Sequence, residues 1–223
     1  LALFAFWRSW QAPDPRTARG WRVAAWAGLG AAFATKGPPG LLPLLLALVF
    51  RGLAPRGEPS PRVLSGVGVG LFALIGLPWY AVAAAAYPGL AEHFLGHEIF
   101  RRAVVGVERR HSGWLHPLII YGPVLTAGAL PWLGLVAVAP RRLFGLARRV
   151  RWRGSPRARL LLLWAVLPVV VFSLVSSRMY LYVLPVFPAL ALACTGACLR
   201  VGGGRFLRPS RAGGLALGAV SAL

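Results

Sequence analysis

The chain has 223 residues, of which 57% are hydrophobic and only 13% charged, and its mean hydropathy is +0.66. A soluble domain carries roughly 25% charged residues, so this composition excludes an ordinary soluble globular protein. The formal net charge of +20 comes from arginines that stand in short segments between apolar runs, as in the cytoplasmic loops of membrane proteins, so we expect a lipid bilayer and no nucleic acid as partner.

Long uncharged runs predict membrane-spanning helices. Four runs of 18 or more residues cover 63–91, 111–140, 160–177 and 179–199. Each is long enough to cross a hydrocarbon core about 30 Å thick at 1.5 Å per residue. We therefore predict an all-α fold, a polytopic transmembrane helical bundle in which residues 1–223 form a single transmembrane domain. Apolar runs reach both ends of the chain, which we interpret as an internal segment of a longer membrane protein.

The placement of charge orients these spans. Most basic residues fall in four clusters, within residues 8–22, 51–62, 141–159 and 200–211. If these clusters are cytoplasmic, the apolar runs between them must cross the membrane an even number of times. Residues 87–116 then form a periplasmic outer loop, in which we expect short interfacial helices, and residues 177–183 form a short outer turn.

The stretch 23–50 holds a single charge, Lys36, within the sequence KGPPG. If 23–50 formed one span, the orientation of every later loop would be reversed. Two prolines flanked by two glycines break a helix, so we predict a hairpin of two short helices, about 20–24 Å each, with its tip near the outer surface. Lys36 at this tip would either extend to the interface or bind a lipid phosphate.

The outer loop carries several groups with possible chemistry. His93 and His97 are four residues apart and share a face on a helix, and with Glu98 they would hold a divalent metal. Surface or helix-capping roles are the alternative. The adjacent Arg101 and Arg102 would clamp phosphate oxygens through their planar guanidinium groups, or contact anionic headgroups.

The last outer turn combines one cation with two tyrosines. Arg178 stands between two apolar runs and is followed by Tyr180 and Tyr182. Arginine and tyrosine are common at membrane interfaces without further function. The two tyrosines would equally donate hydrogen bonds to a phosphate or stack on a sugar.

Three segments together resemble one family. Residues 33–43 read FATKGPPGLLP, residues 97–102 read HEIFRR and residues 177–188 read SRMYLYVLPVFP. In this order they resemble the TKGP hairpin, the outer-loop HE…R segment and the YxLPxxP turn of bacterial membrane glycosyltransferases of the GT-C type, akin to the aminoarabinose transferases and the protein O-mannosyltransferases. The chain departs from the family at position 178, where lysine is usual, and at position 102, where family members carry an aromatic residue.

The resemblance implies an enzyme of the bacterial inner membrane with a multi-helix GT-C fold. Such an enzyme transfers a glycosyl group from a polyprenyl-phosphate-sugar donor to a lipid, protein or glycan acceptor at the outer face. By the same resemblance the donor phosphate would be bound by Lys36, Arg101 or Arg102, Arg178, and Tyr180 or Tyr182. Nearby His97 and Glu98 would bind a divalent metal or contact the acceptor.

The catalytic base is not identified. In the family an acidic residue of the first outer loop acts as base, and we expect that loop to precede residue 1. The outer carboxylates Glu92, Glu98 and Glu108 lie among His and Arg, so they would be ionised and poor proton acceptors. The alternative function is that of a non-catalytic membrane protein, such as a lipid carrier or transporter component, which binds a lipid phosphate with the same cations.

Overall fold

The computed structural model describes residues 1–55, 62–87, 89, 116–138, 155–175 and 179–202. Every regular element in these ranges is helical, in agreement with the predicted all-α class. The α-helices are α1 (Ala2–Gln11), α2 (Pro15–Lys36), α3 (Leu42–Gly52), α4 (Gly66–Gly76), α5 (Pro78–Ala86), α7 (His116–Val138), α9 (Pro156–Leu174) and α10 (Phe187–Gly202). Two 3₁₀ helices precede α3 and α10, namely η1 (Pro38–Leu41) and η3 (Tyr180–Val186).

Side-chain caps determine where three helices begin. The Asp14 carboxylate accepts a hydrogen bond from the backbone N–H of Thr17 at 2.8 Å, which satisfies one of the free donors at the start of α2. This bond lowers the pKa of Asp14. Ser65 and Ser155 cap α4 and α9 in the same way. These polar caps therefore mark where the loops end and the helices begin.

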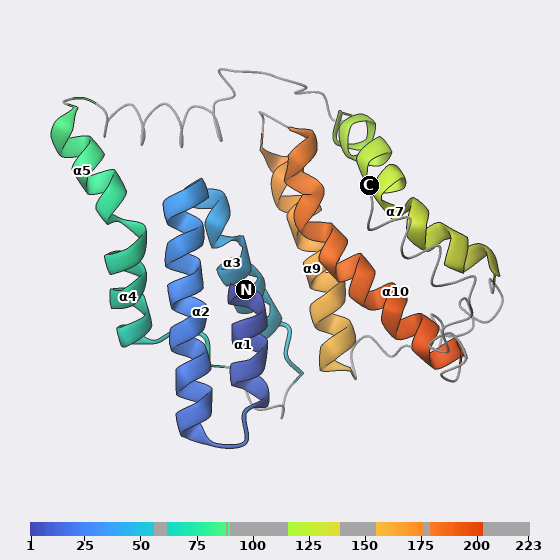
Figure 1. The fold of residues 1–223 in the computed structure, drawn as a ribbon, viewed down its shortest axis with the longest axis horizontal. Coiled ribbons are helices and arrows are strands. Elements are labelled where there is room, and N and C mark those ends of the chain that lie inside the picture. The colour runs from blue at the N-terminus through green and yellow to red at the C-terminus, as the bar shows by residue number, and fades with distance from the viewer. Residues whose placement is uncertain (56–61, 88, 90–115, 139–154, 176–178, 203–223) are drawn as a thin grey trace, which may run out of the picture.

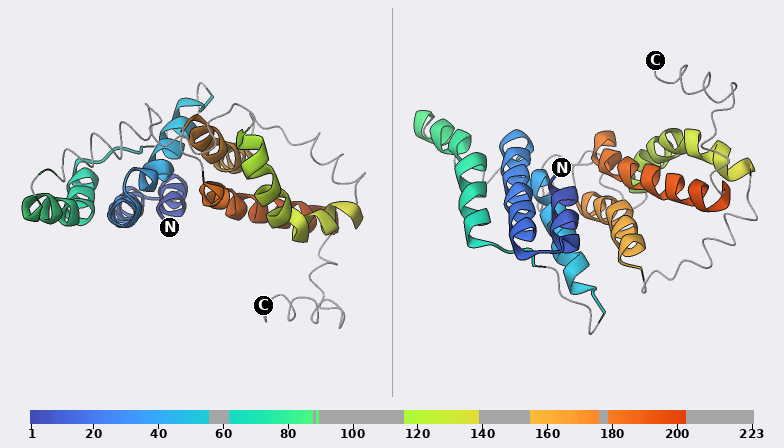
Figure 2. Two further views of the ribbon diagram at one scale, coloured as in Figure 1. Left: turned by 90° about the horizontal axis from the view of Figure 1, so that it is seen from above. Right: turned by 60° about the horizontal axis from the view of Figure 1, so that its bottom comes forward.

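The helices form a curved row. α1 to α5 and α9 run roughly between the same two ends of the molecule, whereas α7 and α10 are inclined to them (Figure 1). α2 packs against α1 and α4, and α9 packs against α3 and α10. Seen from above, the elements follow one another in a row (Figure 2, left). α9 therefore connects the N-terminal helices to the C-terminal ones.

Buried apolar side chains fill the contacts between neighbouring helices. One cluster lies between α1 and α2 and includes Phe6, Trp26 and Leu29. A second cluster joins α7, α9 and η3 around Tyr121 and Phe172. A third joins α1, α3 and α9 through Leu3, Leu46, Phe50 and Leu160. Because α9 contributes side chains to both the second and the third cluster, it packs against helices in both halves of the row.

A proline lies between these two contact regions of α9. Pro168 is buried inside the helix. It has no backbone N–H, so the carbonyl group of Trp164 lacks its usual helical donor. Leu160 on one side of Pro168 belongs to the third cluster, and Phe172 on the other side belongs to the second. The helix thus has its weakest backbone hydrogen bonding between its two packed ends.

Close packing joins α4 to α2. The indole Nε1 of Trp26 donates a hydrogen bond to the carbonyl oxygen of Val63 at 3.1 Å, and Trp26 is 4% exposed. A Cβ atom at Gly68 would overlap the Trp26 ring. A small residue at a helix contact lets two backbones approach closely, which stabilises helix pairs even where apolar burial gives no advantage.

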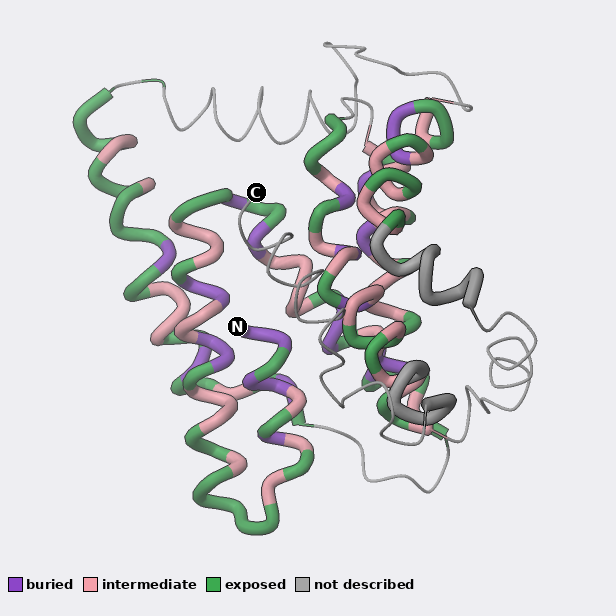
Figure 3. Tube along the Cα trace, turned by 45° about the vertical axis from the view of Figure 1, so that its right-hand side comes forward, coloured by how far each residue is buried: buried purple, intermediate pink, exposed green. Residues whose placement is uncertain are grey.

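Many large apolar side chains point away from the row. Leu74, Leu118 and Leu174 are each more than 70% exposed, and exposed residues follow the outward faces of the helices (Figure 3). Among the described residues, α9 is long and apolar enough to cross a membrane, and α4 with α5, bent by 43°, meets the same condition together. An exposed apolar surface of this kind is typical of contact with lipid or with further protein.

The predicted hairpin at 23–50 is present, but its first helix is longer than expected. The helix breaks at Gly37 and the chain returns through η1 and α3. α2 begins at Pro15 rather than near residue 23 and has 22 residues, about 33 Å at 1.5 Å per residue. The Asp14 cap starts the helix early, and Arg16 and Arg19 are exposed, so charged residues form its first turns.

Candidate functional site

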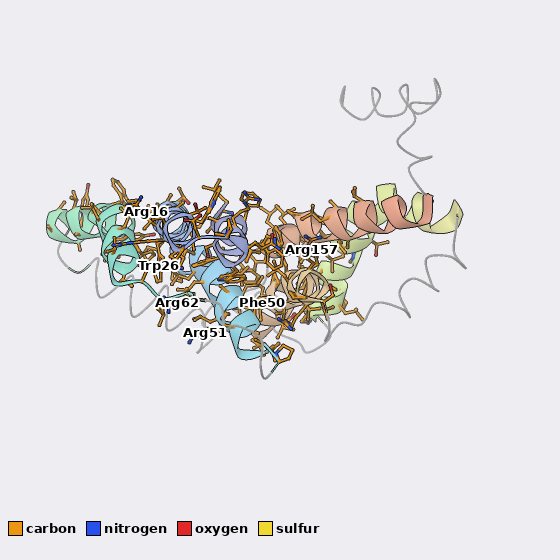
Figure 4. The ribbon with its side chains drawn as sticks, turned by 90° about the horizontal axis from the view of Figure 1, so that it is seen from below. Arg16, Trp26, Phe50, Arg51, Arg62 and Arg157 are labelled. Carbon is orange, nitrogen blue, oxygen red and sulfur yellow. The ribbon has the colours of Figure 1, made fainter. Side chains whose placement is uncertain are left out.

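The two ends of the helices carry different charged residues. Four exposed arginines, Arg16, Arg51, Arg62 and Arg157, belong to the end where α2, α4 and α9 begin and α3 finishes (Figure 4). We call this the arginine end. Lys36 is the last residue of α2 and lies at the opposite end, which α5 and the start of α7 also reach (Figure 1). This separation agrees with the predicted charge topology, and the membrane side that each end faces stays a prediction.

Backbone contacts fix the turn that follows Lys36. Gly37 has a φ of +64°, a left-handed value that glycine adopts without strain, and its N–H donates to the carbonyl oxygen of Phe33 at 2.7 Å. The N–H of Gly40 donates to the carbonyl oxygen of Gly37 at 2.8 Å. A Cβ atom at Gly40 would lie 2.6 Å from backbone atoms of Ala32. The position of the exposed Lys36 is therefore set by two glycines.

Tyr80 of α5 connects the same turn to the next helix. Its hydroxyl donates to the carbonyl oxygen of Phe33 at 3.1 Å, and the ring centroids of Tyr80 and Phe33 are 5.3 Å apart. The Phe33 carbonyl thus accepts bonds from both Gly37 and Tyr80. Our sequence reasoning missed Tyr80. A tyrosine in an apolar run signals a buried hydroxyl that needs an acceptor, but it does not identify the acceptor.

The turn that carries the two candidate tyrosines is 3₁₀ helical. Tyr180 is exposed, whereas the Tyr182 ring stacks on Phe172 with a centroid distance of 4.7 Å. The buried Tyr121 of α7 donates from its hydroxyl to the carbonyl oxygen of Phe172 at 3.1 Å. Val183 is buried in the same cluster. The backbone of η3 is therefore held between α7 and α9, and the Tyr182 ring has a defined position.

The Lys36 hairpin and the tyrosine turn meet at the end of the helices opposite the arginine end. Leu42, the first residue of α3 after the turn, packs against the cluster formed by Tyr121, Phe172 and Val183. That cluster includes Tyr182 at its edge. Segments that are about 140 residues apart in the sequence are thus neighbours, and Lys36, Tyr180 and Tyr182 belong to the same end.

The other predicted phosphate ligands, Arg101, Arg102 and Arg178, lie outside the described residues, as do His93, His97 and Glu98. The described part of the chain contains no group of three or more His, Cys, Asp or Glu that would hold a metal ion. The divalent metal therefore stays a prediction. The outer loop 87–116 and its interfacial helices also fall almost entirely outside the described ranges.

Comparison with curated proteins identifies relatives along most of the chain. No family model matches the sequence. An undecaprenyl phosphate-alpha-4-amino-4-deoxy-L-arabinose arabinosyl transferase of Pseudomonas fluorescens is 34% identical over 197 residues, which cover 86% of this chain and 33% of that protein. A transferase with the same description from Edwardsiella ictaluri is 32% identical over 209 residues, 93% of this chain and 36% of that protein. The chain spans about a third of the length of these relatives.

Solved structures give the same result for the fold. The crystal structure of ArnT from Cupriavidus metallidurans in the apo state matches 89% of this chain with a TM-score of 0.68 and 29% identity. The structure of the same protein bound to undecaprenyl phosphate matches 99% of this chain with a TM-score of 0.66. This chain covers 34% and 38% of those two chains. Sequence and fold therefore confirm the resemblance, and the chain is related to a segment, about one third in length, of the bacterial undecaprenyl phosphate-aminoarabinose arabinosyl transferases.

Proposed function

We propose that this chain is part of a membrane glycosyltransferase. The enzyme would take a glycosyl group from a polyprenyl-phosphate-sugar donor and transfer it to a lipid, protein or glycan acceptor at the outer face of the bacterial inner membrane. The names of the relatives favour 4-amino-4-deoxy-L-arabinose as the sugar. The observation that carries the proposal is the contact of Leu42 with the Tyr121–Phe172–Val183 cluster, because it brings the Lys36 hairpin beside the tyrosine turn.

The proposed chemistry depends on charge at the leaving group. When the glycosidic bond breaks, negative charge develops on the polyprenyl phosphate, and cations already in position stabilise that charge without reorganisation. Lys36 would supply one such cation and Tyr180 or Tyr182 a hydrogen bond. Arg101 or Arg102 and Arg178 would complete the phosphate site, and a carboxylate outside residues 1–223 would accept the acceptor's proton.

We propose a polytopic arrangement with the Lys36 end outside and the arginine end in the cytoplasm, in a single transmembrane domain. Exposed Leu74, Leu118 and Leu174 support contact with lipid along the helices. The positive-inside rule supports the orientation, because Arg16, Arg51, Arg62 and Arg157 share one end.

Thiol labelling tests the orientation. In a protein with Cys194 and Cys198 replaced by serine, Tyr87→Cys should react with a membrane-impermeant reagent in intact spheroplasts, because Tyr87 is exposed at the end of α5. Arg19→Cys, exposed near the start of α2, should react only after permeabilisation. Labelling of Arg19→Cys in intact spheroplasts without labelling of Tyr87→Cys would contradict the proposed orientation and indicate the opposite one.

A transfer assay tests the activity. Membranes that contain the full-length protein should transfer label from a radiolabelled undecaprenyl-phosphate aminoarabinose donor to a lipid acceptor, and membranes without the protein should not. Donor binding without transfer would favour a lipid carrier instead. Absence of both binding and transfer would contradict any donor site.

The two tyrosines should differ in their effect on transfer. We expect Tyr182→Phe to reduce donor turnover by about 10- to 150-fold, since a hydrogen bond to a charged phosphate contributes roughly 1.5–3 kcal/mol. The Tyr182 ring is already held by Phe172, so its hydroxyl loses little freedom when it binds. Tyr180→Phe should have a smaller effect. Both variants keep the ring, so thermal denaturation should be unchanged, and a larger loss in Tyr180→Phe would assign the hydrogen bond to Tyr180.

A further inference from the structure

Tyr80 of α5 has no role in the proposed transfer, yet it contacts the turn that carries Lys36. Its hydroxyl donates a hydrogen bond to the carbonyl oxygen of Phe33, which belongs to the last turn of α2. The same oxygen accepts the N–H of Gly37, the residue after Lys36. One carbonyl oxygen therefore joins the backbone before Lys36 to the backbone after it, and Tyr80 holds that oxygen.

A break between α4 and α5 brings Tyr80 to this carbonyl. α4 ends at Gly76 and α5 begins at Pro78, with a bend of 43° between the two helices. A Cβ atom at Gly76 would lie 3.2 Å from the carbonyl oxygen of Gly30, so α4 and α2 approach closely just before the bend. Beyond the bend, α5 inclines away from α2 (Figures 1 and 2). Contact with α2 therefore falls to the first turn of α5, where Tyr80 lies.

Ring contacts fix the direction of the Tyr80 side chain. The Phe33 ring lies 5.3 Å from the Tyr80 ring and 5.3 Å from the Phe72 ring, measured between centroids. Tyr80 is half-buried, whereas Tyr87 at the end of α5 is 67% exposed. A tyrosine whose ring is already packed loses little further freedom when its hydroxyl forms a hydrogen bond.

The direction of the hydrogen bond separates Tyr80 from the tyrosines of η3. A carbonyl oxygen only accepts, so the single proton of the Tyr80 hydroxyl is directed at Phe33. While this bond exists, that proton cannot bind a phosphate oxygen, which is the role proposed for Tyr180 or Tyr182. Tyr80 is therefore suited to hold the backbone rather than to bind the donor.

The position of the backbone at Lys36 matters because the lysine side chain is long and exposed. A cation stabilises charge that develops in a reaction most effectively when it is already in place. The last four carbonyl groups of a helix lack helical donors, and the last turn frays unless other donors reach them. Phe33 has two such donors, Gly37 and Tyr80.

We propose that Tyr80 is a positioning residue, which acts through the Phe33 carbonyl to fix the end of α2 and hence the point from which Lys36 reaches the donor phosphate. This inference rests on the proposed function, because it takes Lys36 as a phosphate ligand. The same bond holds the start of α5, from which the chain continues into the predicted outer loop, against the Lys36 turn.

Electron paramagnetic resonance tests the positioning without a donor. The full-length protein would carry a nitroxide at Lys36→Cys, with its native cysteines, Cys194 and Cys198 included, replaced by serine. Tyr80→Phe removes one hydroxyl and keeps the ring, and we expect a more mobile label. Tyr87→Phe makes the same change at the exposed end of α5 and should leave the spectrum unchanged. An unchanged spectrum in Tyr80→Phe, or an equal change in both variants, would overturn the proposal.

Donor titration tests whether the effect passes through Lys36. Tyr80→Phe should weaken binding of the polyprenyl-phosphate-sugar donor by about 3- to 10-fold, the effect of one lost neutral hydrogen bond. In the Lys36→Ala background the same change should add less than about twofold, because the two residues act as one unit. Equal losses in the two backgrounds would overturn the proposal and indicate a direct contact or general destabilisation.

The two measurements separate this inference from the proposed function. If Tyr80→Phe increases the mobility of the label while Lys36→Ala leaves donor binding unchanged, the phosphate role of Lys36 is wrong and the hold of Tyr80 on its turn is supported. If Lys36→Ala weakens donor binding while Tyr80→Phe changes neither the label nor the binding, the phosphate role stands and the positioning role is wrong.

Discussion

Replacement of Lys36 by alanine should weaken donor binding by about 10- to 150-fold, which corresponds to the loss of a charge-assisted contact of roughly 1.5–3 kcal/mol. Lys36 ends α2 at an exposed position beside the turn formed by Gly37 and Gly40. Its ammonium group would face the phosphate whose negative charge increases as the sugar leaves, so turnover should fall with affinity. Donor titration and initial rates in reconstituted membranes measure both quantities.

Two further variants make this result specific. Lys36→Arg keeps the positive charge and should retain more binding than Lys36→Ala, although the altered geometry of the guanidinium will reduce turnover. Arg19→Ala removes one positive charge from an exposed position near the other end of the same helix and should leave donor binding unchanged. If Lys36→Ala and Arg19→Ala have equal donor affinity, Lys36 does not contact the phosphate.

The second large effect is expected for Gly40→Ala. The added Cβ would lie 2.6 Å from backbone atoms of Ala32, and neither backbone can move aside without separating η1 from α2. Overpacking of this kind typically costs about 1–3 kcal/mol. The thermal transition should fall, and donor binding should fall with it because the turn that positions Lys36 must open. Thermal denaturation in detergent and donor titration measure the two changes.

Gly20→Ala provides the matched control. Gly20 lies inside α2, and a Cβ atom there would meet nothing within 4 Å. Alanine has a lower conformational entropy cost than glycine in a helix, so this variant should be more stable by roughly 0.5–1 kcal/mol. Equal thermal transitions for Gly20→Ala and Gly40→Ala would show that the contact of Gly40 with Ala32 is not restrictive.

The Lys36 hairpin is predictable from sequence because its cause is local. The prolines and glycines of residues 37–40 interrupt a helix wherever they occur, and the structure breaks the helix at Gly37. The start of α2 is harder to predict from hydropathy, because the first long apolar run begins near residue 23 and places the start of the helix there. The hydrogen bond from Thr17 to Asp14 decides it instead, and this cap is a short polar signal within an arginine cluster.

The neighbours of the site are less accessible to sequence reasoning. The family resemblance names Tyr180 and Tyr182 together, but only the packing of Tyr182 on Phe172 distinguishes them. Likewise, the bond from Tyr80 to the carbonyl oxygen of Phe33 joins residues 47 positions apart. Such contacts depend on how helices pack, and an apolar run gives no information about which of its faces meets which neighbour.

The buried Pro168 of α9 has a mechanical consequence. On the N-terminal side of Pro168, Leu160 packs α9 against α1 and α3. On the C-terminal side, Phe172 packs α9 against η3. Phe172, on which the Tyr182 ring stacks, lies four residues beyond Pro168, about 6 Å along the helix at 1.5 Å per residue. A change of about 10° in the bend at Pro168 would thus displace Phe172, and the Tyr182 ring stacked on it, by roughly 1 Å, about a third of the length of a hydrogen bond. The position of the tyrosine turn relative to the lysine hairpin therefore depends on the angle of α9 at Pro168.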